Sequence, residues 1–186
     1  MGGEFLASMR GWVRLAIGKP EMEVSIWAQL GIFIFMSELT VSTQVAAPLE
    51  RTFQAFTNLE KAVERVPAIT AVEILSEGPF GEGTRWRETR LMFKKEATEE
   101  MWVTGFNPPN SYTVEAESHG MKYSTLFEFT TVGDGTKVTW TFTGKALTLG
   151  AKIMAPIFNV LMKGMMRKCM LGDLEAIRDA CESGES

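Results

Sequence analysis

The chain has 186 residues, of which 45% are hydrophobic and 23% charged, a composition that fits an ordinary globular domain and excludes disorder throughout. Its 19 basic and 23 acidic side chains give a net charge of −4, whereas a nucleic-acid partner requires a basic surface. With one histidine, His119, and two cysteines, the sequence also argues against a Ser-His-Asp site, a metal centre and a disulfide framework. We therefore expect no metal, no cofactor and no nucleic-acid partner.

Residues 1–37 differ from the rest of the chain in their pattern of residue types and contain an apolar run over 24–36. This run is shorter than the roughly 20 residues that a membrane-spanning helix requires. We interpret 1–37 as an N-terminal extension that is poorly packed or not part of the core. Two alternatives stay open, namely an added strand or helix, and a targeting or membrane-contacting segment through 24–36.

The next part of the chain alternates between apolar and polar side chains, which indicates strands. The first strand, 39–45, precedes two short helices, because Pro48 suits a first helical turn, Asn58 suits a helix cap and Pro67 ends the second helix. Turns rich in glycine and proline separate six further strands, whose close spacing predicts antiparallel pairing: 69–76, 84–93, 98–106, 111–118, 121–131 and 136–145.

Beyond Ala146 the spacing of apolar residues changes to about 3.6, the period of a helix with one buried stripe. The pattern predicts a helix of about 30 residues that ends around Cys181, with Pro156 kinking it near its start. The chain then ends in a polar tail, 183–186.

Four motifs lie at the junctions between these elements: Val45-Ala-Ala-Pro-Leu-Glu-Arg-Thr-Phe53, Gly81-Glu-Gly-Thr-Arg-Trp-Arg87, Phe106-Asn-Pro-Pro109 and Gly133-Asp-Gly-Thr-Lys-Val138. With these motifs in this order before a long final helix, residues 38–182 resemble the START-like (SRPBCC) superfamily, above all its polyketide cyclase/dehydrase and lipid-transport branch. The resemblance implies an α+β helix-grip fold, in which a curved seven-stranded antiparallel sheet wraps around a long C-terminal helix and two short helices follow the first strand. It also implies a cavity for an apolar or amphipathic ligand, without fixing a reaction.

Side-chain alternation assigns a helix-facing side to the last three strands, and the final helix adds methionines that can repack around different guests. For strands 84–93 and 98–106 the inward face stays undecided, because bulky side chains occur on both faces. The same side chains could form an ordinary filled core, but the resemblance favours a pocket. We predict these ligand-binding residues: Trp86, Met101, Val103, Tyr112, Tyr123, Phe127, Trp140, Phe142, Ile157, Leu161, Met162 and Met165.

Four polar side chains are candidate catalytic residues: Glu88, Arg90, Tyr112 and Tyr123. If Glu88 and Arg90 point inward, they form a buried ion pair whose carboxyl group could abstract a proton beside a carbonyl. The two tyrosine hydroxyls could orient a carbonyl or a phenol. The alternatives are an exposed pair on the strand and aromatic side chains whose tips reach solvent or backbone.

An enzyme requires ionisable groups that converge inside the cavity, and these four residues are the only candidates in the sequence. This small number favours a binding protein over an enzyme. We therefore predict a cytoplasmic protein that sequesters or transports a hydrophobic or aromatic small molecule, lipid-like or polyketide-like, between the sheet and the C-terminal helix. One alternative is a polyketide aromatase/cyclase that uses the same cavity. Another is an interaction or assembly accessory module of the same superfamily. The ligand's identity and the oligomeric state are left open.

Overall fold

The computed structural model describes residues 36–92 and 95–184, without the side chains of 36, 37, 92 and 151–162. The described residues belong to one compact unit. The expectations for residues 1–35, including most of the apolar run over 24–36, lie outside the described residues.

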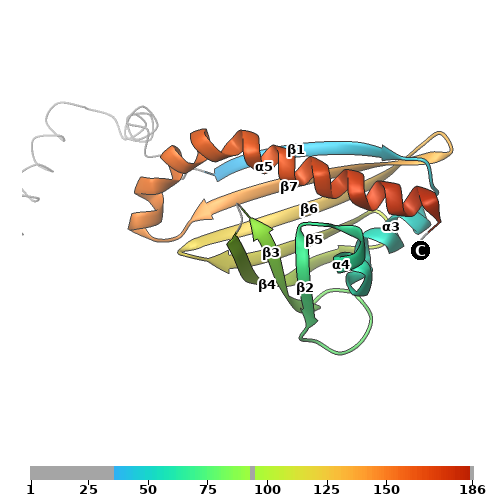
Figure 1. Cartoon of the computed structure of the whole chain (residues 1–186), viewed down its shortest axis with the longest axis horizontal. Coiled ribbons are helices and arrows are strands. Elements are labelled where there is room, and N and C mark those ends of the chain that lie inside the picture. Colours follow the sequence, from blue (N-terminus) through green and yellow to red (C-terminus); the bar gives the residue numbers. More distant parts are fainter. Residues whose placement is uncertain (1–35, 93–94, 185–186) are drawn as a thin grey trace, which may run out of the picture. The chain divides into compact units, whose positions relative to one another are not determined.

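The described elements follow the predicted order of a strand, short helices, six strands and a long helix (Figure 1). Most predicted element ends differ from the observed ones by a few residues. The bounds are β1 Met36–Val45, α3 Leu49–Thr57, the 3-10 helix η1 Leu59–Lys61, α4 Ala62–Arg65, β2 Ile69–Ile74, β3 Arg85–Met92, β4 Lys95–Asn107, β5 Ser111–Ser118, β6 Met121–Val132, β7 Gly135–Ala146 and α5 Leu149–Ser183.

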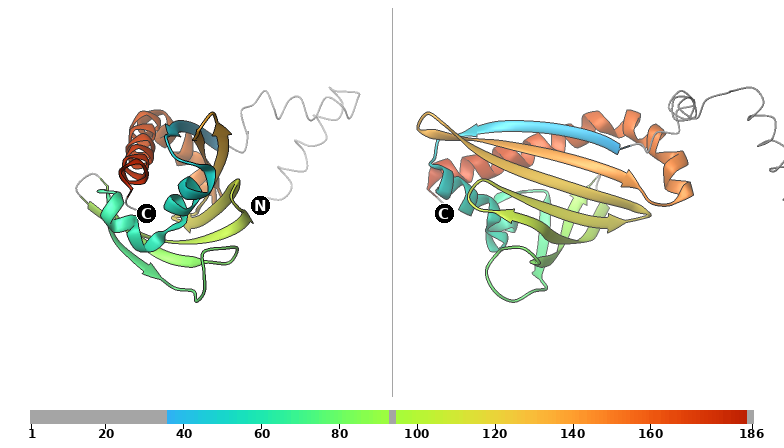
Figure 2. Two further views of the ribbon diagram at one scale, coloured as in Figure 1. Left: turned by 90° about the vertical axis from the view of Figure 1, so that its right-hand side faces the viewer. Right: turned by 180° about the vertical axis from the view of Figure 1, so that it is seen from behind.

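The seven strands form one antiparallel sheet in the order β1-β7-β6-β5-β4-β3-β2. The strand β1 pairs with the last strand, β7, with Leu39 opposite Phe142 and Val45 opposite Thr136. The other pairs join strands that follow each other along the chain. Figure 2 shows the sheet curving around α5, which lies on its concave side. The predicted α+β helix-grip fold is therefore confirmed.

The helix α3 begins directly after Pro48, whose carbonyl accepts the first helical hydrogen bond from the Thr52 amide at 2.9 Å. One side of this helix is buried and carries Phe53 and Phe56. The helix stops at Asn58, whose side chain accepts a hydrogen bond from the Lys61 amide and so caps the next turn. The local sequence thus directs two phenylalanine rings into the interior.

The two strands whose faces were undecided now have a clear assignment. Trp86, Glu88 and Arg90 share the inner face of β3, because Trp86 lies opposite Met101, which in turn lies opposite Ala116 on the inner face of β5. Outside, the Arg85 guanidinium sits 5.3 Å from the centre of the Trp102 ring.

The strand β4 carries an irregularity that explains its ambiguous pattern. The register with β5 shifts between Val103 and Gly105, which is the behaviour of a β-bulge. Val103 lies opposite Val114 before the shift and Phe106 lies opposite Tyr112 after it. Both side chains therefore face inward although they are an odd number of residues apart.

The helix α5 is continuous from Leu149 to Ser183, and Figure 1 shows it turning near its N-terminal end. A proline inside a helix removes one backbone hydrogen bond, and the sequence of α5 contains Pro156; a kink at this residue stays a prediction. Met170, Leu174 and Cys181 fall on one side of the helix and are almost completely buried. No helix in the described part of the chain is long and apolar enough to cross a membrane.

Candidate ligand-binding site

The inner face of the sheet can be followed as rows of side chains that lie opposite each other on neighbouring strands. Each row crosses several strands, so residues far apart in the sequence become neighbours. Three rows are Val41, Trp140, Phe127 and Tyr112; then Leu39, Phe142, Thr125 and Val114; then Tyr123, Ala116, Met101 and Trp86.

One end of this inner face is filled by the protein's own aromatic rings. The Phe129 ring centre lies 5.2 Å from that of Phe53 and 5.4 Å from that of Phe56. The Tyr112 ring stacks on Phe127, with the ring centres 4.9 Å apart. Edge-to-face and offset contacts of this kind add to the stabilisation from burial. We call this end, next to α3, the closed end.

Several inward side chains on the same face are only half-buried. They are Met101, Tyr123, Phe127, Trp140 and Phe142, and we call them the half-buried stretch. The Tyr123 ring stacks on Phe142 with ring centres 5.6 Å apart, and Phe127 contacts Trp140 at 4.9 Å. All five were predicted as ligand-binding residues. The stretch combines large apolar surface with contact to water, on the face of the sheet that α5 covers (Figure 2).

The remaining predicted wall residues divide into three groups. Trp86, Val103 and Tyr112 are at most 4% exposed and belong to the packed core. Met165 is 41% exposed, while the adjacent Met166 is half-buried and packs against the core. At this turn of α5 the inward methionine is therefore Met166, whereas the helical spacing of the sequence predicted Met165. The side chains of the last three lie outside the described residues: Ile157, Leu161 and Met162.

The candidates Glu88 and Arg90 do point inward, and a third residue joins them. The Arg90 Nε lies 2.7 Å from Glu88 Oε1, and Arg90 Nη2 donates a hydrogen bond to Asp173 Oδ2 on α5. The Trp86 Nε1 donates to Glu88 Oε2 at 3.5 Å. We call Glu88, Arg90 and Asp173 the ion cluster. Asp173 is not among the predicted site residues, although an acidic residue inside the apolar stripe beside Met170 and Leu174 is a usable signal in the sequence.

The ion cluster holds two carboxyl groups against one guanidinium. Burial raises the pKa of Glu88, and the positive charge of Arg90 opposes that shift. Burial likewise raises the pKa of Asp173 against the same opposing charge. Burial disfavours the charged form of Arg90, but Asp173 and Glu88 outweigh it and raise its pKa. Removal of a carboxylate from water favours its neutral form, so this cluster accepts a proton more readily than exposed carboxylates do.

The two candidate tyrosines have different surroundings. The Tyr112 hydroxyl donates a hydrogen bond to the Phe56 carbonyl at 3.2 Å, so it serves the closed end. Burial raises the pKa of Tyr112, which keeps this hydroxyl protonated. Tyr123 is half-buried, and burial raises its pKa as well. Of the two, only Tyr123 belongs to the half-buried stretch.

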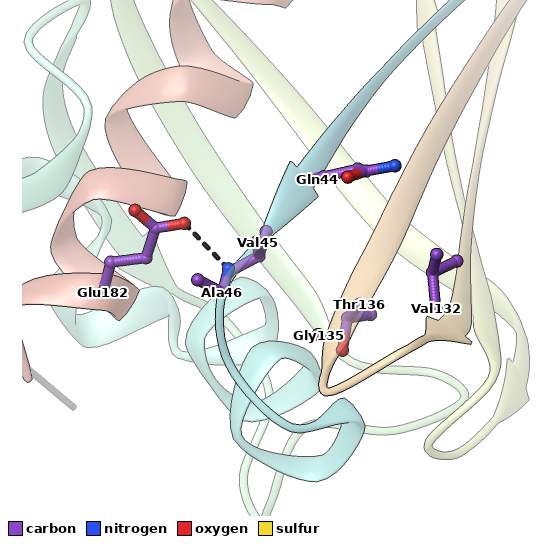
Figure 3. Close-up of a pocket in the computed structure, with 7 residues that line it drawn as sticks. All are labelled: Gln44, Val45, Ala46, Val132, Gly135, Thr136 and Glu182. Atoms are coloured by element: carbon purple, nitrogen blue, oxygen red, sulfur yellow. Dashed lines mark hydrogen bonds between the residues drawn. The ribbon is translucent and has the colours of Figure 1, made fainter.

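Two surface hollows lie elsewhere. One, of about 270 Å³, is lined by residues near the end of β1, the β6–β7 turn and the end of α5, where Glu182 accepts a hydrogen bond from the Ala46 amide at 2.8 Å (Figure 3). The other, of about 390 Å³, runs along α5 beside Arg167, Lys168 and Leu171. Val132 in the first hollow lies at the opposite end of β6 from Tyr123, so that hollow is separate from the half-buried stretch.

Within residues 36–92 and 95–184, no group of three or more His, Cys, Asp or Glu side chains is arranged to hold a metal ion. In the same residues, Cys169 and Cys181 are free thiols. The chemistry that this part of the chain offers is therefore that of apolar surface, a few neutral polar groups and the ion cluster.

A curved antiparallel sheet that grips a C-terminal helix is the architecture of the START-like (SRPBCC) superfamily. The profile of the family described as "Polyketide cyclase / dehydrase and lipid transport" matches residues 36–182, and the chain belongs to this family. Comparison with curated protein sequences finds no significant match.

Solved structures share the fold. The protein TTHA0849 from Thermus thermophilus is 19% identical with a TM-score of 0.67, covering 81% of this chain and 100% of that one. The Zhui aromatase/cyclase from Streptomyces sp. R1128 is 15% identical with a TM-score of 0.63, covering 81% and 96%. Norcoclaurine synthase from Thalictrum flavum, in complex with dopamine and hydroxybenzaldehyde, is 14% identical with a TM-score of 0.59, covering 81% and 89%. Identities this low establish the fold only.

Proposed function

We propose that the protein binds a hydrophobic or aromatic small molecule between α5 and the half-buried stretch of the sheet, as a carrier or a sequestering protein. The observation that carries the proposal is the half-burial of Tyr123, Phe127, Trp140 and Phe142 on the inner face. Side chains of a completed core are fully buried, as the closed end illustrates with Phe129 at 3% exposed.

A guest over this stretch would gain free energy by removing the remaining aromatic surface from water, at about 25 cal/mol per Å² of apolar area. Met101 on the sheet and Met166 on the helix both pack against the core, and flexible thioethers can adapt to guests of different outline. The family description names lipid transport, and the Thalictrum flavum enzyme is described in complex with two aromatic compounds. These similarities support the proposal for this chain.

The first test is native mass spectrometry of the freshly purified full chain, followed by extraction and identification of any retained compound. Binding of Nile red, an uncharged dye whose fluorescence rises in apolar surroundings, measures the same site without knowledge of the natural guest. We expect a one-to-one complex with the dye. A chain that retains no compound and binds no dye would contradict the proposal.

A variant that fills the site makes the test specific. Thr125 lies between Phe142 and Val114 on the inner face, and the neighbouring Ser124 points to the outer face of the same strand. We expect Thr125→Trp to weaken dye binding about tenfold or more while the unfolding midpoint is kept, because the new ring occupies space that the guest requires. Ser124→Trp is the matched control and should bind as the wild type does. Equal binding by the two variants would place the site elsewhere.

The inward ion cluster favours a second candidate function, that of an aromatase/cyclase-type enzyme. Glu88 is a buried carboxyl group with a raised pKa, and such a group can exchange a proton with a ketone during aldol closure and loss of water. A short linear diketone whose carbonyls are spaced for six-membered ring closure would serve as the probe, with the enone product followed by its absorbance. This function requires a rate above buffer that Glu88→Gln abolishes and the outer-face variant Glu100→Gln retains.

A further inference from the structure

Trp140 carries a polar atom for which the described residues supply no hydrogen-bond partner. The residue lies on the inner face of β7, opposite Val41 on one side and Phe127 on the other. Its indole Nε1 is buried, and no acceptor for its hydrogen occurs among the described residues. The indole N–H is a donor only, so this group needs an acceptor nearby and cannot form a hydrogen bond in any other way.

The other inward tryptophan shows how this fold normally treats the same group. Trp86 is buried in the core, and its Nε1 donates to the Glu88 carboxylate at 3.5 Å. A buried N–H without an acceptor loses its hydrogen bonds to water and gains none in return, so nearly all buried polar groups in native proteins have a partner. Among the described residues, Arg90 Nε and Trp140 Nε1 are the two such exceptions, and Arg90 Nε lies 2.7 Å from a Glu88 oxygen. Trp140 belongs to the half-buried stretch.

We propose that the Trp140 indole N–H is the hydrogen-bond donor for the bound molecule, and that the guest is an apolar or aromatic compound carrying a neutral oxygen acceptor such as a ketone. This proposal rests on the proposed binding function and names the class of guest. A plain hydrocarbon would leave the N–H unpaired, whereas a carbonyl over the ring edge would pair it inside apolar surroundings, where such a bond is stronger than in water.

The surroundings favour a neutral acceptor over an anion. Val41 and Phe127, the neighbours of Trp140 in its row, bring no charge. The inward cation of β3, Arg90, is already paired with Glu88 and Asp173. A carboxylate guest would therefore be buried without a counter-charge, which is far more costly than burying a ketone that accepts one hydrogen bond.

The experiment compares two probes that differ in one acceptor, acetylnaphthalene and ethylnaphthalene substituted at the same ring position. Each is titrated against the full chain by displacement of the uncharged dye Nile red. We expect Trp140→Phe to weaken binding of the ketone roughly three- to tenfold more than binding of the hydrocarbon, because only the ketone loses a hydrogen bond. Trp102→Phe, the same exchange on the outer face, is the control and should leave both affinities unchanged.

A second measurement uses the unaltered protein, so it does not depend on the folding of the variant. In proton–nitrogen NMR spectra the indole signal of Trp140, identified by its loss in Trp140→Phe, should move downfield with the ketone and stay nearly in place with the hydrocarbon. Equal weakening of both probes in Trp140→Phe, or an indole signal that the ketone does not move, overturns the proposal while the binding function stands. If the wild type binds neither probe nor dye, the binding function fails and this proposal fails with it.

Discussion

Arg90 is the residue on which the interior charges depend. Glu88 and Asp173 are both less than a tenth exposed, and both make their ion pair with this one guanidinium. Burial of two charges together costs desolvation that their attraction repays only in good geometry, so the intact cluster need not stabilise the fold. Loss of Arg90 should destabilise the fold, because two buried carboxylates then lie close together without a positive charge.

We therefore expect Arg90→Met to lower the free energy of unfolding by about 3–5 kcal/mol at neutral pH. Arg87→Met is the control on the same strand, since Arg87 pairs with Glu73 on the exposed face, and exposed pairs contribute at most about 1 kcal/mol. Urea unfolding followed by circular dichroism measures both values. Equal losses in the two variants would mean that the inner cluster is no more important than a surface pair.

The direction of the carboxyl pKa shifts gives stability a predictable dependence on pH. Burial raises the pKa of Glu88 above its ordinary value of 4.5, so just above that value the folded state keeps a proton that the unfolded chain has released. The free energy of unfolding should then fall as pH rises from 4.5 through the raised pKa. In Glu88→Gln that fall should be smaller. Unfolding curves collected at a series of pH values check this, and parallel profiles for the two proteins would refute it.

At the scale of the elements, the inner face of the sheet has two parts that differ in burial, and one of them packs against the short helix α3. Phe53 and Phe56 from α3 close around Phe129 at one end. Tyr123 and Phe142 lie outside this ring group and remain half-buried. Stability should therefore depend mainly on the closed end, and binding on the half-buried stretch.

A pair of alanine variants separates the two roles. Phe129→Ala removes a ring that is 3% exposed and should cost about 3–5 kcal/mol of unfolding free energy. Phe142→Ala removes a half-buried ring, so its cost should be clearly smaller, while dye binding weakens several-fold. Thermal unfolding and dye titration on both variants give the comparison. If Phe142→Ala cost as much stability as Phe129→Ala, the half-buried stretch would be core and not a binding surface.

The elements themselves were predictable, because alternation and helical spacing are local properties that survive folding. Two placements were not. The inner face of β4 depends on the bulge between Val103 and Gly105, which no local pattern reveals. The inward side of α5 depends on how the helix rotates against the sheet, and a rotation of about 100° per residue is enough to exchange Met165 for Met166. The burial of each inward ring depends on how all the elements pack together. The division into closed end and half-buried stretch could therefore be found only from the structure.

At the scale of the whole molecule, β1 completes the sheet from the other end of the chain. It covers the edge of β7 along its full length, and its inward residues Leu39, Val41 and Val45 are buried. Between β1 and α5 the described chain contains every strand of the sheet and the helix that it grips. We therefore predict that the folded domain starts near β1 and does not require the residues before it.

Two truncations test where the folding unit begins. A chain that starts at Met36 should unfold within about 2 °C of the full-length protein and bind the dye equally, because no strand or buried side chain of the described sheet is lost. A chain that starts at Ala46 should fail to fold, since β7 then presents an unpaired edge and the core loses Leu39, Val41 and Val45. Circular dichroism melting curves distinguish these outcomes. If the first truncation also failed to fold, residues 1–35 would have to be counted as part of the domain.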